Sequence, residues 1–273
     1  MEKSIFEMME QKRISTDKGP IVYWISKCQS EYTLVFLHGL TADHTLFEKQ
    51  ISYFCGHFNL FCWDAPAHGK SRPFSNFAYS SIAKNLKDIL EKERLKNIIL
   101  IGQSMGGFIA QTYIKLYPNT IKGFVGIDTC PFGKSYYTKF DKWCLHQIEW
   151  MSMCFPHKLL TTSIAKSCTY TNSAYQNMMI ALQPYSKKEL CHLMGAGYTE
   201  FLQENCDVKI TCPVLILVGE HDKTGKVKQY CAAWHKNTLH PLYIIPNAAH
   251  NSNFDNSEAV NLKIDMFIQN LMQ

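Results

Sequence analysis

Apolar residues gather along the chain in short runs with amphipathic stretches between them. The runs that we expect to form strands cover residues 33–37, 59–63, 97–102, 123–127, 213–218 and 242–245. Because nearly every position in these runs is apolar, they predict strands that are buried on both faces, as in a parallel sheet. A further strand over residues 21–27 follows the turn signal Asp17-Lys18-Gly19-Pro20, and we expect it to belong to an N-terminal antiparallel pair.

The stretches between several of these runs have a helical period. Residues 45–55 and 79–94 predict helices, residues 108–116 have helical character, and a last amphipathic helix begins near Asp255. Asp255 and Glu258 have the spacing of a helix-capping pair. Alternating strands and helices predict an α/β fold with a mostly parallel, twisted sheet that carries helices on both faces.

The pattern changes between residues 131 and 206, where no buried strand is expected. Short helical stretches, divided by Pro156 and Pro184, are rich in aromatic residues and methionine. These residues are Tyr136, Tyr137, Phe140, Trp143, Trp150, Met151, Met153, Phe155, Met178, Met179 and Met194. They either pack the helices together or roof the catalytic edge of the sheet and make its pocket more apolar than charged. We predict a core formed by residues 1–130 and 207–273, with residues 131–206 inserted as a helical cap.

Composition and charge narrow the classes of function. The chain has 273 residues and a formal charge of +5 that is spread along its length, which argues against a nucleic-acid partner. Its 11 cysteines form no C-x-x-C motif and no His/Cys cluster at metal spacing, so we expect free thiols, a reducing cytoplasm and no metal. No run approaches the roughly 18 to 20 apolar residues that span a bilayer, and the start of the chain lacks the apolar region of a secretory signal. We therefore expect a soluble cytoplasmic protein.

The candidate chemistry centres on Gly102-Gln103-Ser104-Met105-Gly106, a G-x-S-x-G pattern between a predicted strand and a predicted helix. A strand that turns sharply into a helix holds the turn residue in an unfavourable conformation, so the positions two before and two after it need glycine. The turn lifts the serine hydroxyl clear of the sheet. It also brings the first amides of the helix, a positive dipole end, beside that hydroxyl.

A serine hydroxyl needs a base that takes its proton, and imidazole does this best when a carboxylate orients it. His250 follows the last predicted strand in a loop of small residues, and Asp222 follows the strand over residues 213–218. Asp128 also ends a strand and stays open as the acid. Ligands of such sheets lie outside the carboxyl ends of the strands, where all these residues are expected.

Other polar residues near the predicted strand ends have structural interpretations. We expect His38 to brace its own loop through hydrogen bonds and His68 to hold its own turn. Glu220 is expected to be structural or to face solvent. The remaining histidines considered as bases, which we interpret as surface or loop residues, are His221, His235 and His240.

Taken together, these motifs resemble the α/β-hydrolase superfamily over nearly the whole chain. They comprise His38-Gly39 after an early strand, the turn over residues 64–71, the Ser104 elbow, the inserted cap, Gly219-x-x-Asp222 and the late His250. The chain order serine, acid, histidine is the order that this fold uses.

The resemblance implies a role for each matching residue. Ser104 would be the nucleophile, His250 the general base and then acid, and Asp222 its orienting partner. The backbone N–H groups of Leu40 and Met105 would form the oxyanion hole. Ala67 departs from the pattern, because many relatives carry glycine there; we expect it to change the shape of the loop and not the chemistry.

The resemblance implies a serine hydrolase of the carboxylesterase kind. It would act through an acyl-enzyme on a small to medium, largely apolar and uncharged ester, without a cofactor. Serine at the elbow, where relatives that displace halide or open epoxides carry aspartate, argues against both of those reactions. Lactonase, thioesterase, aminopeptidase and carbon–carbon hydrolase activities use the same triad and stay open. So does a small-molecule sensor of the same fold, which binds its ligand at the triad and signals to a protein partner through the cap.

Overall fold

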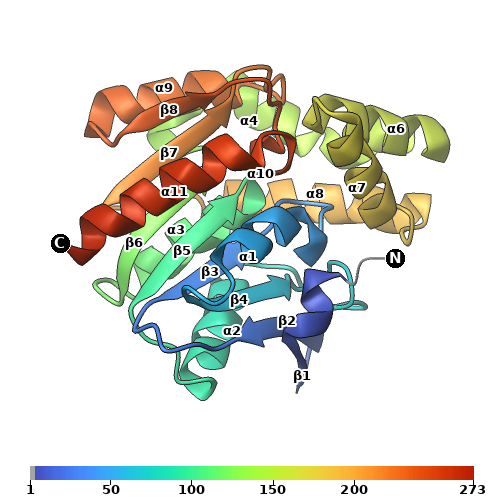
Figure 1. Ribbon diagram of the computed structural model, residues 1–273. Helices are drawn as coiled ribbons and strands as arrows, with labels where there is room; N and C mark the ends of the chain where they lie inside the picture. Colours follow the sequence, from blue (N-terminus) through green and yellow to red (C-terminus); the bar gives the residue numbers. More distant parts are fainter. Residues whose placement is uncertain (1–3) are drawn as a thin grey trace.

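The computed structural model describes residues 4–273 as a sheet of eight strands covered by helices (Figure 1). The strands are β1 (Glu10–Thr16), β2 (Gly19–Ser26), β3 (Thr33–Leu37), β4 (Asn59–Asp64), β5 (Ile98–Gln103), β6 (Ile121–Ile127), β7 (Val214–Gly219) and β8 (Leu242–Ile245). Their order across the sheet is β1-β2-β4-β3-β5-β6-β7-β8. The β1–β2 and β2–β4 pairs are antiparallel, and all the others are parallel. The predicted mostly parallel sheet with an N-terminal antiparallel pair is confirmed.

Helices cover both faces of this sheet. They are α1 (Glu48–Phe54), α2 (Tyr79–Lys92), α3 (Met105–Leu116), α4 (Lys139–His146), α5 (Ile148–Met153), α6 (His157–Cys168), α7 (Asn172–Leu182), α8 (Lys187–Glu204), α9 (Val227–Thr238), α10 (Ser252–Asp255) and α11 (Ser257–Met272). Helices α1 and α11 pack on one face, and α2, α3 and α9 pack on the other (Figure 1). Within residues 4–273, no helix has the length and apolarity that crossing a membrane requires.

The unbroken apolar runs follow from this two-sided burial. In β3, Leu34 and Phe36 join the core under α1 and α11, whereas Val35 and Leu37 join the core under α2 and α3. Side chains alternate between the faces of a strand, so a strand covered on both faces needs apolar residues at every position. All five residues of β3 are buried.

The helical insertion predicted after β6 is present as α4–α8 (Figure 1). A third apolar cluster joins it to the core, because Ala42 and Leu46 of the core pack with Leu160, Met178 and Leu190 of the insertion. The two expected breaks are also present. Pro156 caps the start of α6, and Pro184 lies between α7 and α8. The domain boundaries at residues 130/131 and 206/207 stay predictions.

The sequence pattern did not predict two of the observed elements, β1 and α9. Strand β1 is an edge strand without a fully buried residue, so it has no apolar run. Helix α9 buries only Cys231 and Trp234, which gives a weak helical period.

The start of the last helix differs from our expectation. Asn256, and not Asp255, caps α11 by accepting a hydrogen bond of 3.2 Å from the amide of Ala259. The carboxylate of Asp255 instead accepts hydrogen bonds from the backbone of Tyr170 and Thr171. The spacing of Asp255 and Glu258 in the sequence could not reveal that distant backbone amides bind the same carboxylate.

Candidate active site

Ser104 occupies the tight turn between β5 and α3 with φ 50° and ψ −116°, a backbone conformation that costs an L-residue energy. The two glycines of the motif make the turn possible. A Cβ at Gly102 would lie 2.5 Å from the carbonyl oxygen of Gly106, and one at Gly106 would overlap the carbonyl oxygen of Leu37. The Thr129 hydroxyl donates a hydrogen bond of 2.7 Å to the Ser104 carbonyl oxygen, which fixes the turn from the β6 side.

The structure brings Ser104, His250 and Asp222 into one chain of hydrogen bonds. The Nε2 atom of His250 lies 2.9 Å from Ser104 Oγ, and its Nδ1 atom lies 2.9 Å from Asp222 Oδ2. Asp222 Oδ1 accepts a further hydrogen bond of 2.8 Å from the amide of Thr224. The imidazole that carries its proton on Nδ1 donates to Asp222 and leaves Nε2 free to accept the serine proton.

His250 and Asp222 each stabilise the charged form of the other. Burial by itself lowers the pKa of His250, but the charge and hydrogen bond of Asp222 outweigh burial and raise that pKa above 6.5. Burial also opposes the ionisation of Asp222, yet the neighbouring His250 holds the pKa of Asp222 below its usual value. The pair therefore favours an ionised Asp222 carboxylate, which stabilises the His250 imidazole when it gains a second proton.

Asp128, the other candidate acid, has different partners. Its two carboxylate oxygens accept hydrogen bonds from the amides of Gly219, at 2.7 Å, and Ser252, at 3.0 Å. It thus ties the end of β7 to the segment that follows His250. Burial, with the charge of Asp222 adding to it, raises the pKa of Asp128 to about 8. The geometry pairs His250 with Asp222 and gives Asp128 a bracing position.

Leu40 and Met105 line the same cavity as Ser104. Over residues 4–273, neither of their backbone N–H groups donates a hydrogen bond. Gly39 brings the β3 loop close to the serine, since a Cβ at Gly39 would lie 3.2 Å from Ser104 Cβ. Met105 is also the first residue of α3, where the helix dipole is positive. Two residues whose amides have no hydrogen-bond partner in the described part of the chain therefore line the cavity at Ser104, and their role as an oxyanion hole stays a prediction.

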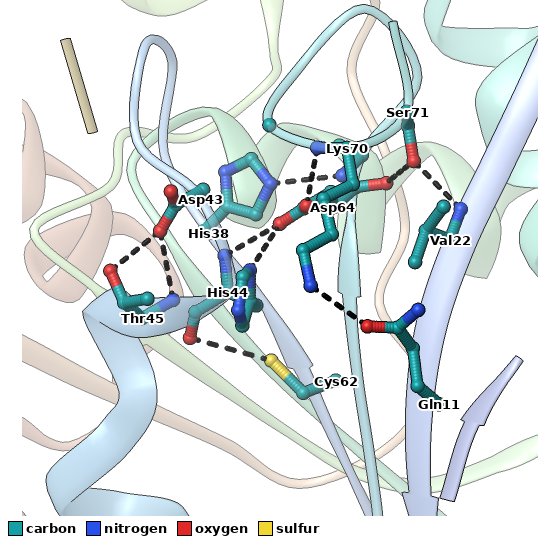
Figure 2. A network of polar contacts seen from close by, with 12 residues as sticks. Gln11, Val22, His38, Asp43, His44, Thr45, Cys62, Asp64, Lys70 and Ser71 are labelled. Carbon is teal, nitrogen blue, oxygen red and sulfur yellow. Dashed lines mark hydrogen bonds and ion pairs between the residues drawn. The ribbon is translucent and has the colours of Figure 1, made fainter. Parts of the chain in front are cut away.

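The loop that carries Leu40 is braced by a buried polar network (Figure 2). The Nδ1 atom of His38 bonds to the carbonyl oxygen of Gly39 at 2.8 Å, and its Nε2 atom accepts a hydrogen bond of 2.9 Å from the amide of Ala65. Burial lowers the pKa of His38, which matches a neutral ring with one donor and one acceptor. His68 bonds to the carbonyl oxygen of Pro66 in its own turn. The bracing positions predicted for both histidines agree with these contacts.

One cluster in this network has the composition of a metal site. Ligand-type atoms of Asp43, His44 and Asp64 lie within 4.8 Å of one another. These atoms are already engaged, because His44 Nδ1 lies 2.7 Å from Asp64 Oδ1 and Asp43 Oδ1 accepts hydrogen bonds from Thr45 (Figure 2). Since the side chains bond one another and the backbone, we interpret the cluster as a structural brace.

Sequence reasoning missed the groups that hold the His250 loop in place. The Nε2 atom of Gln103 donates a hydrogen bond of 2.8 Å to the carbonyl oxygen of His250. Asp255 accepts one of 2.9 Å from the amide of Ala249. The amide of Asn251 donates to the carbonyl oxygen of Cys168, at the end of α6, at 2.7 Å. Gln103 lies inside the elbow motif, but its position there carries no sign of this contact.

Two cavities open at Ser104 and His250. The larger has a volume of about 480 Å³ and the smaller about 140 Å³. A third cavity of about 890 Å³ lies beside Tyr32 and Tyr53, where β3 begins. It is at the amino ends of the parallel strands, whereas Ser104 is at their carboxyl ends. Because ligands of such sheets bind at the carboxyl ends of the strands, the two cavities at Ser104 are the candidate substrate site.

The apolar side chains of the cap have several environments. Tyr136 and Met179 are partly buried and pack against the apolar core clusters. Tyr137 and Phe140 line the larger cavity, and Met178 and Met194 line the smaller one. Others neither pack in the interior nor roof the site, contrary to both expectations. Exposed in this way are Trp143, Trp150, Met151, Met153 and Phe155.

A mostly parallel sheet, a serine in a strained strand-to-helix turn and a helical insertion after β6 together define an α/β-hydrolase fold. Residues 32–257 match the family model described as the alpha/beta hydrolase fold, and the chain belongs to this family. The predicted superfamily is confirmed.

Individual similarities are more distant. The chain is 28% identical over 109 residues, 40% of each chain, to a pimeloyl-[acyl-carrier protein] methyl ester esterase of Wigglesworthia glossinidia brevipalpis. It is 30% identical over 123 residues, 42% of this chain and 36% of the relative, to ethanol acetyltransferase 1 of Cyberlindnera jadinii. The matches thus span about two fifths of the length of these curated relatives.

Among solved structures, an esterase from Exiguobacterium antarcticum superposes with a TM-score of 0.79 at 18% identity. The superposition covers 93% of this chain and 97% of the esterase. At this identity the likeness shows the fold alone.

Proposed function

We propose that this protein is a serine hydrolase that cleaves carboxylic esters through an acyl-enzyme. The observation that carries the proposal is the chain of hydrogen bonds from Ser104 through His250 to Asp222. Ser104 and His250 also line a cavity that could hold the substrate. The names of partial relatives, among them a methyl ester esterase, support an ester as the substrate. In this proposal Ser104 is the nucleophile, His250 the general base and acid, and Asp222 the residue that orients it.

The proposed reaction has two halves. In the first, Ser104 Oγ attacks the ester carbonyl carbon while its proton passes to His250 Nε2, and the amides of Leu40 and Met105 stabilise the oxyanion. The tetrahedral intermediate collapses as His250 gives the proton to the departing alkoxide. In the second half, His250 takes a proton from water, the resulting hydroxide attacks the acyl-enzyme, and Ser104 regains its proton as the acid leaves. No cofactor takes part in this scheme.

The larger cavity favours an uncharged, largely apolar substrate. Aromatic rings contribute much of its lining, including Tyr79, Phe108 and Phe201. The ammonium group of Lys226, which also lines it, is neutralised by Asp141 Oδ1 at 2.7 Å. An ionic group held against this aromatic wall would lose hydration, although the exposed Lys223 also lines the cavity and could pair with an anion at its rim. Lactones, thioesters, amides and activated carbon–carbon bonds fit the same chemistry and differ in the leaving group alone.

The test is hydrolysis of methyl 4-phenylbutanoate, followed by chromatography, by the wild type and by Ser104→Ala. We expect kcat/KM to fall at least about a thousandfold in the variant, because the nucleophile is removed, while the circular dichroism spectrum stays the same. Ser80→Ala, a change at an exposed serine of α2, is the matched control and should keep full activity. Undiminished hydrolysis by Ser104→Ala would disprove the assignment. A single round of hydrolysis in the wild type, without sustained turnover, would favour the small-molecule sensor.

A further inference from the structure

The two cavities at Ser104 lie on opposite sides of it. The larger is lined by residues that follow β6 and β7, such as Thr129 and Val227, whereas the smaller is lined by residues that follow β3, such as Thr41 and Ala42. Because β3 and β6 flank β5 in the sheet, these loops flank the serine that follows β5. Both cavities share a wall that includes Ser104 and His250.

The larger cavity has the size and chemistry for a bulky apolar group. Its volume of about 480 Å³ falls within the range of about 300–1,000 Å³ found for small-molecule sites. Its wall contains packed aromatic rings, since Phe108 and Phe201 stack with centroids 4.6 Å apart. Such a wall suits an aromatic or aliphatic chain.

The smaller cavity is confined and more polar. Its volume of about 140 Å³ corresponds to about four or five groups the size of a water molecule, at about 30 Å³ each. Ala42 and Met178, which belong to the cluster between cap and core, set its limits. Thr41, Ser167 and Asn251 add polar groups to its lining. The buried hydroxyl of Thr224, which lines both cavities, has no hydrogen-bond partner within the described part of the chain.

We propose that the substrates are esters of bulky apolar carboxylic acids with small alcohols, from methanol up to about four or five non-hydrogen atoms. This inference rests on the proposed ester hydrolysis. When the ester carbonyl carbon lies at Ser104, its acyl chain and its alkoxy group point in different directions. Each group therefore needs its own cavity. The alkoxy side is the smaller cavity, because water must later attack the acyl-enzyme from the side that the alcohol has left. A confined cavity with hydroxyl and amide groups holds a small alcohol and then that water, whereas the aromatic cavity holds the acyl chain.

The first test compares three esters under identical conditions. Methyl 4-phenylbutanoate has a bulky acid and a small alcohol, its isomer 3-phenylpropyl acetate has the reverse, and 3-phenylpropyl 4-phenylbutanoate is bulky on both sides. We expect kcat/KM for the methyl ester to exceed that for the isomer by about tenfold or more, and that for the doubly bulky ester by about a hundredfold or more. A preference for the acetate, or equal hydrolysis of the doubly bulky ester, would overturn the inference.

The second test enlarges the smaller cavity. Met194 of α8 lines this cavity and not the larger one, and it is only half-buried, so Met194→Ala should fold. We expect the ratio of kcat/KM for hexyl over methyl 4-phenylbutanoate to rise about tenfold in this variant, because hexanol exceeds the size that the wild-type cavity holds. Met153→Ala, at an exposed methionine of α5 outside both cavities, should leave the ratio unchanged. An unchanged ratio in Met194→Ala would contradict the assignment of the smaller cavity.

Labelling of Ser104 with a small fluorophosphonate separates the two levels of the proposal. If Ser104 is labelled and esters are hydrolysed without size preference, the inference about the cavities fails and the proposed function stands. If Ser104 is not labelled and no ester is hydrolysed, the proposed function fails, and the inference fails with it.

Discussion

Two residues with left-handed backbone conformations shape the site. Ser104 has φ 50° at the elbow, and Ala67 has φ 69° in the turn after β4. We expected alanine at position 67 to change the loop. Ala67 has a positive φ, which glycine adopts readily, and its amide closes the turn through a hydrogen bond of 3.2 Å to the carbonyl oxygen of Ser71. The alanine Cβ therefore adds strain to a turn of this shape. The effect of the alanine on the shape of this loop stays a prediction.

Ala67→Gly should relieve that strain. An L-residue in the left-handed region costs about 1–2 kcal/mol, part of which the greater freedom of unfolded glycine offsets. We expect the free energy of unfolding to rise by about 0.5–1 kcal/mol, measured by urea denaturation. Ala232→Gly, at an exposed position of α9, is the control and should lower it by about 1 kcal/mol. Equal destabilisation by both changes would show that position 67 is not strained.

The pH dependence of hydrolysis tests the pairing of His250 with Asp222. His250 must be neutral to accept the serine proton, and Asp222 raises its pKa above 6.5. The value of kcat/KM should therefore fall as the pH decreases, with its midpoint at or above pH 6.5. A flat profile between pH 5 and 8 would argue against histidine as the base.

Substitution of the two candidate acids separates their roles. Asp222→Asn should lower kcat by about 10⁴-fold, because the wrong imidazole tautomer is favoured. Asp128→Asn should lower kcat far less, because Asp128 bonds to the amides of Gly219 and Ser252 and not to His250. Its main cost should be in stability, since the side-chain NH₂ group cannot accept a hydrogen bond from a backbone amide. A larger loss of kcat in Asp128→Asn than in Asp222→Asn would reverse the assignment of the acid.

Among the elements, the loop between β8 and α10 depends on the cap. Asp255, at the end of α10, accepts hydrogen bonds from the amides of Thr171, at 2.7 Å, and Ala249, at 2.9 Å. It thus links the start of α7 to the residue before His250. The position of His250 is therefore coupled to the docking of the cap.

Asp255→Ala should weaken both stability and catalysis. The loss of several charge-assisted hydrogen bonds should lower the free energy of unfolding by about 2–3 kcal/mol. The value of kcat should fall more than KM changes, because His250 loses its orientation. Calorimetry and ester kinetics measure the two effects, with Asp88→Ala on the exposed face of α2 as the control. A loss of stability without any change in kcat would show that the hydrogen bonds of Asp255 do not position His250.

The same elements show what the sequence can predict. Strands such as β3 and β5 are apolar at almost every position because both faces of the sheet are covered, so their runs mark them clearly. The elbow glycines are dictated by close contacts within a single turn. The contacts of Gln103 with His250 and of Asp255 with Thr171 join segments far apart in the chain, so no local pattern reveals them.

At the scale of the whole molecule, the fold brings to one sheet edge residues that are widely separated in the sequence. Ser104, Asp222 and His250 follow β5, β7 and β8, and their order in the chain already predicts that they meet. The sizes of the cavities were not predictable, because they depend on how α4–α8 pack over the core. The exposed aromatic residues of the cap are an example, because their number suggested packed helix faces or a roof over the site, and several of them face solvent.

The most direct test of the central claim is intact-protein mass spectrometry after reaction with a small fluorophosphonate, followed by peptide mapping. If His250 and Asp222 activate Ser104 as we propose, the wild type gains the mass of one adduct, which maps to Ser104, and Ser104→Ala gains none. If the wild type stays unmodified, or if Ser104→Ala is labelled to the same extent, Ser104 is not the activated nucleophile and the proposed mechanism is wrong.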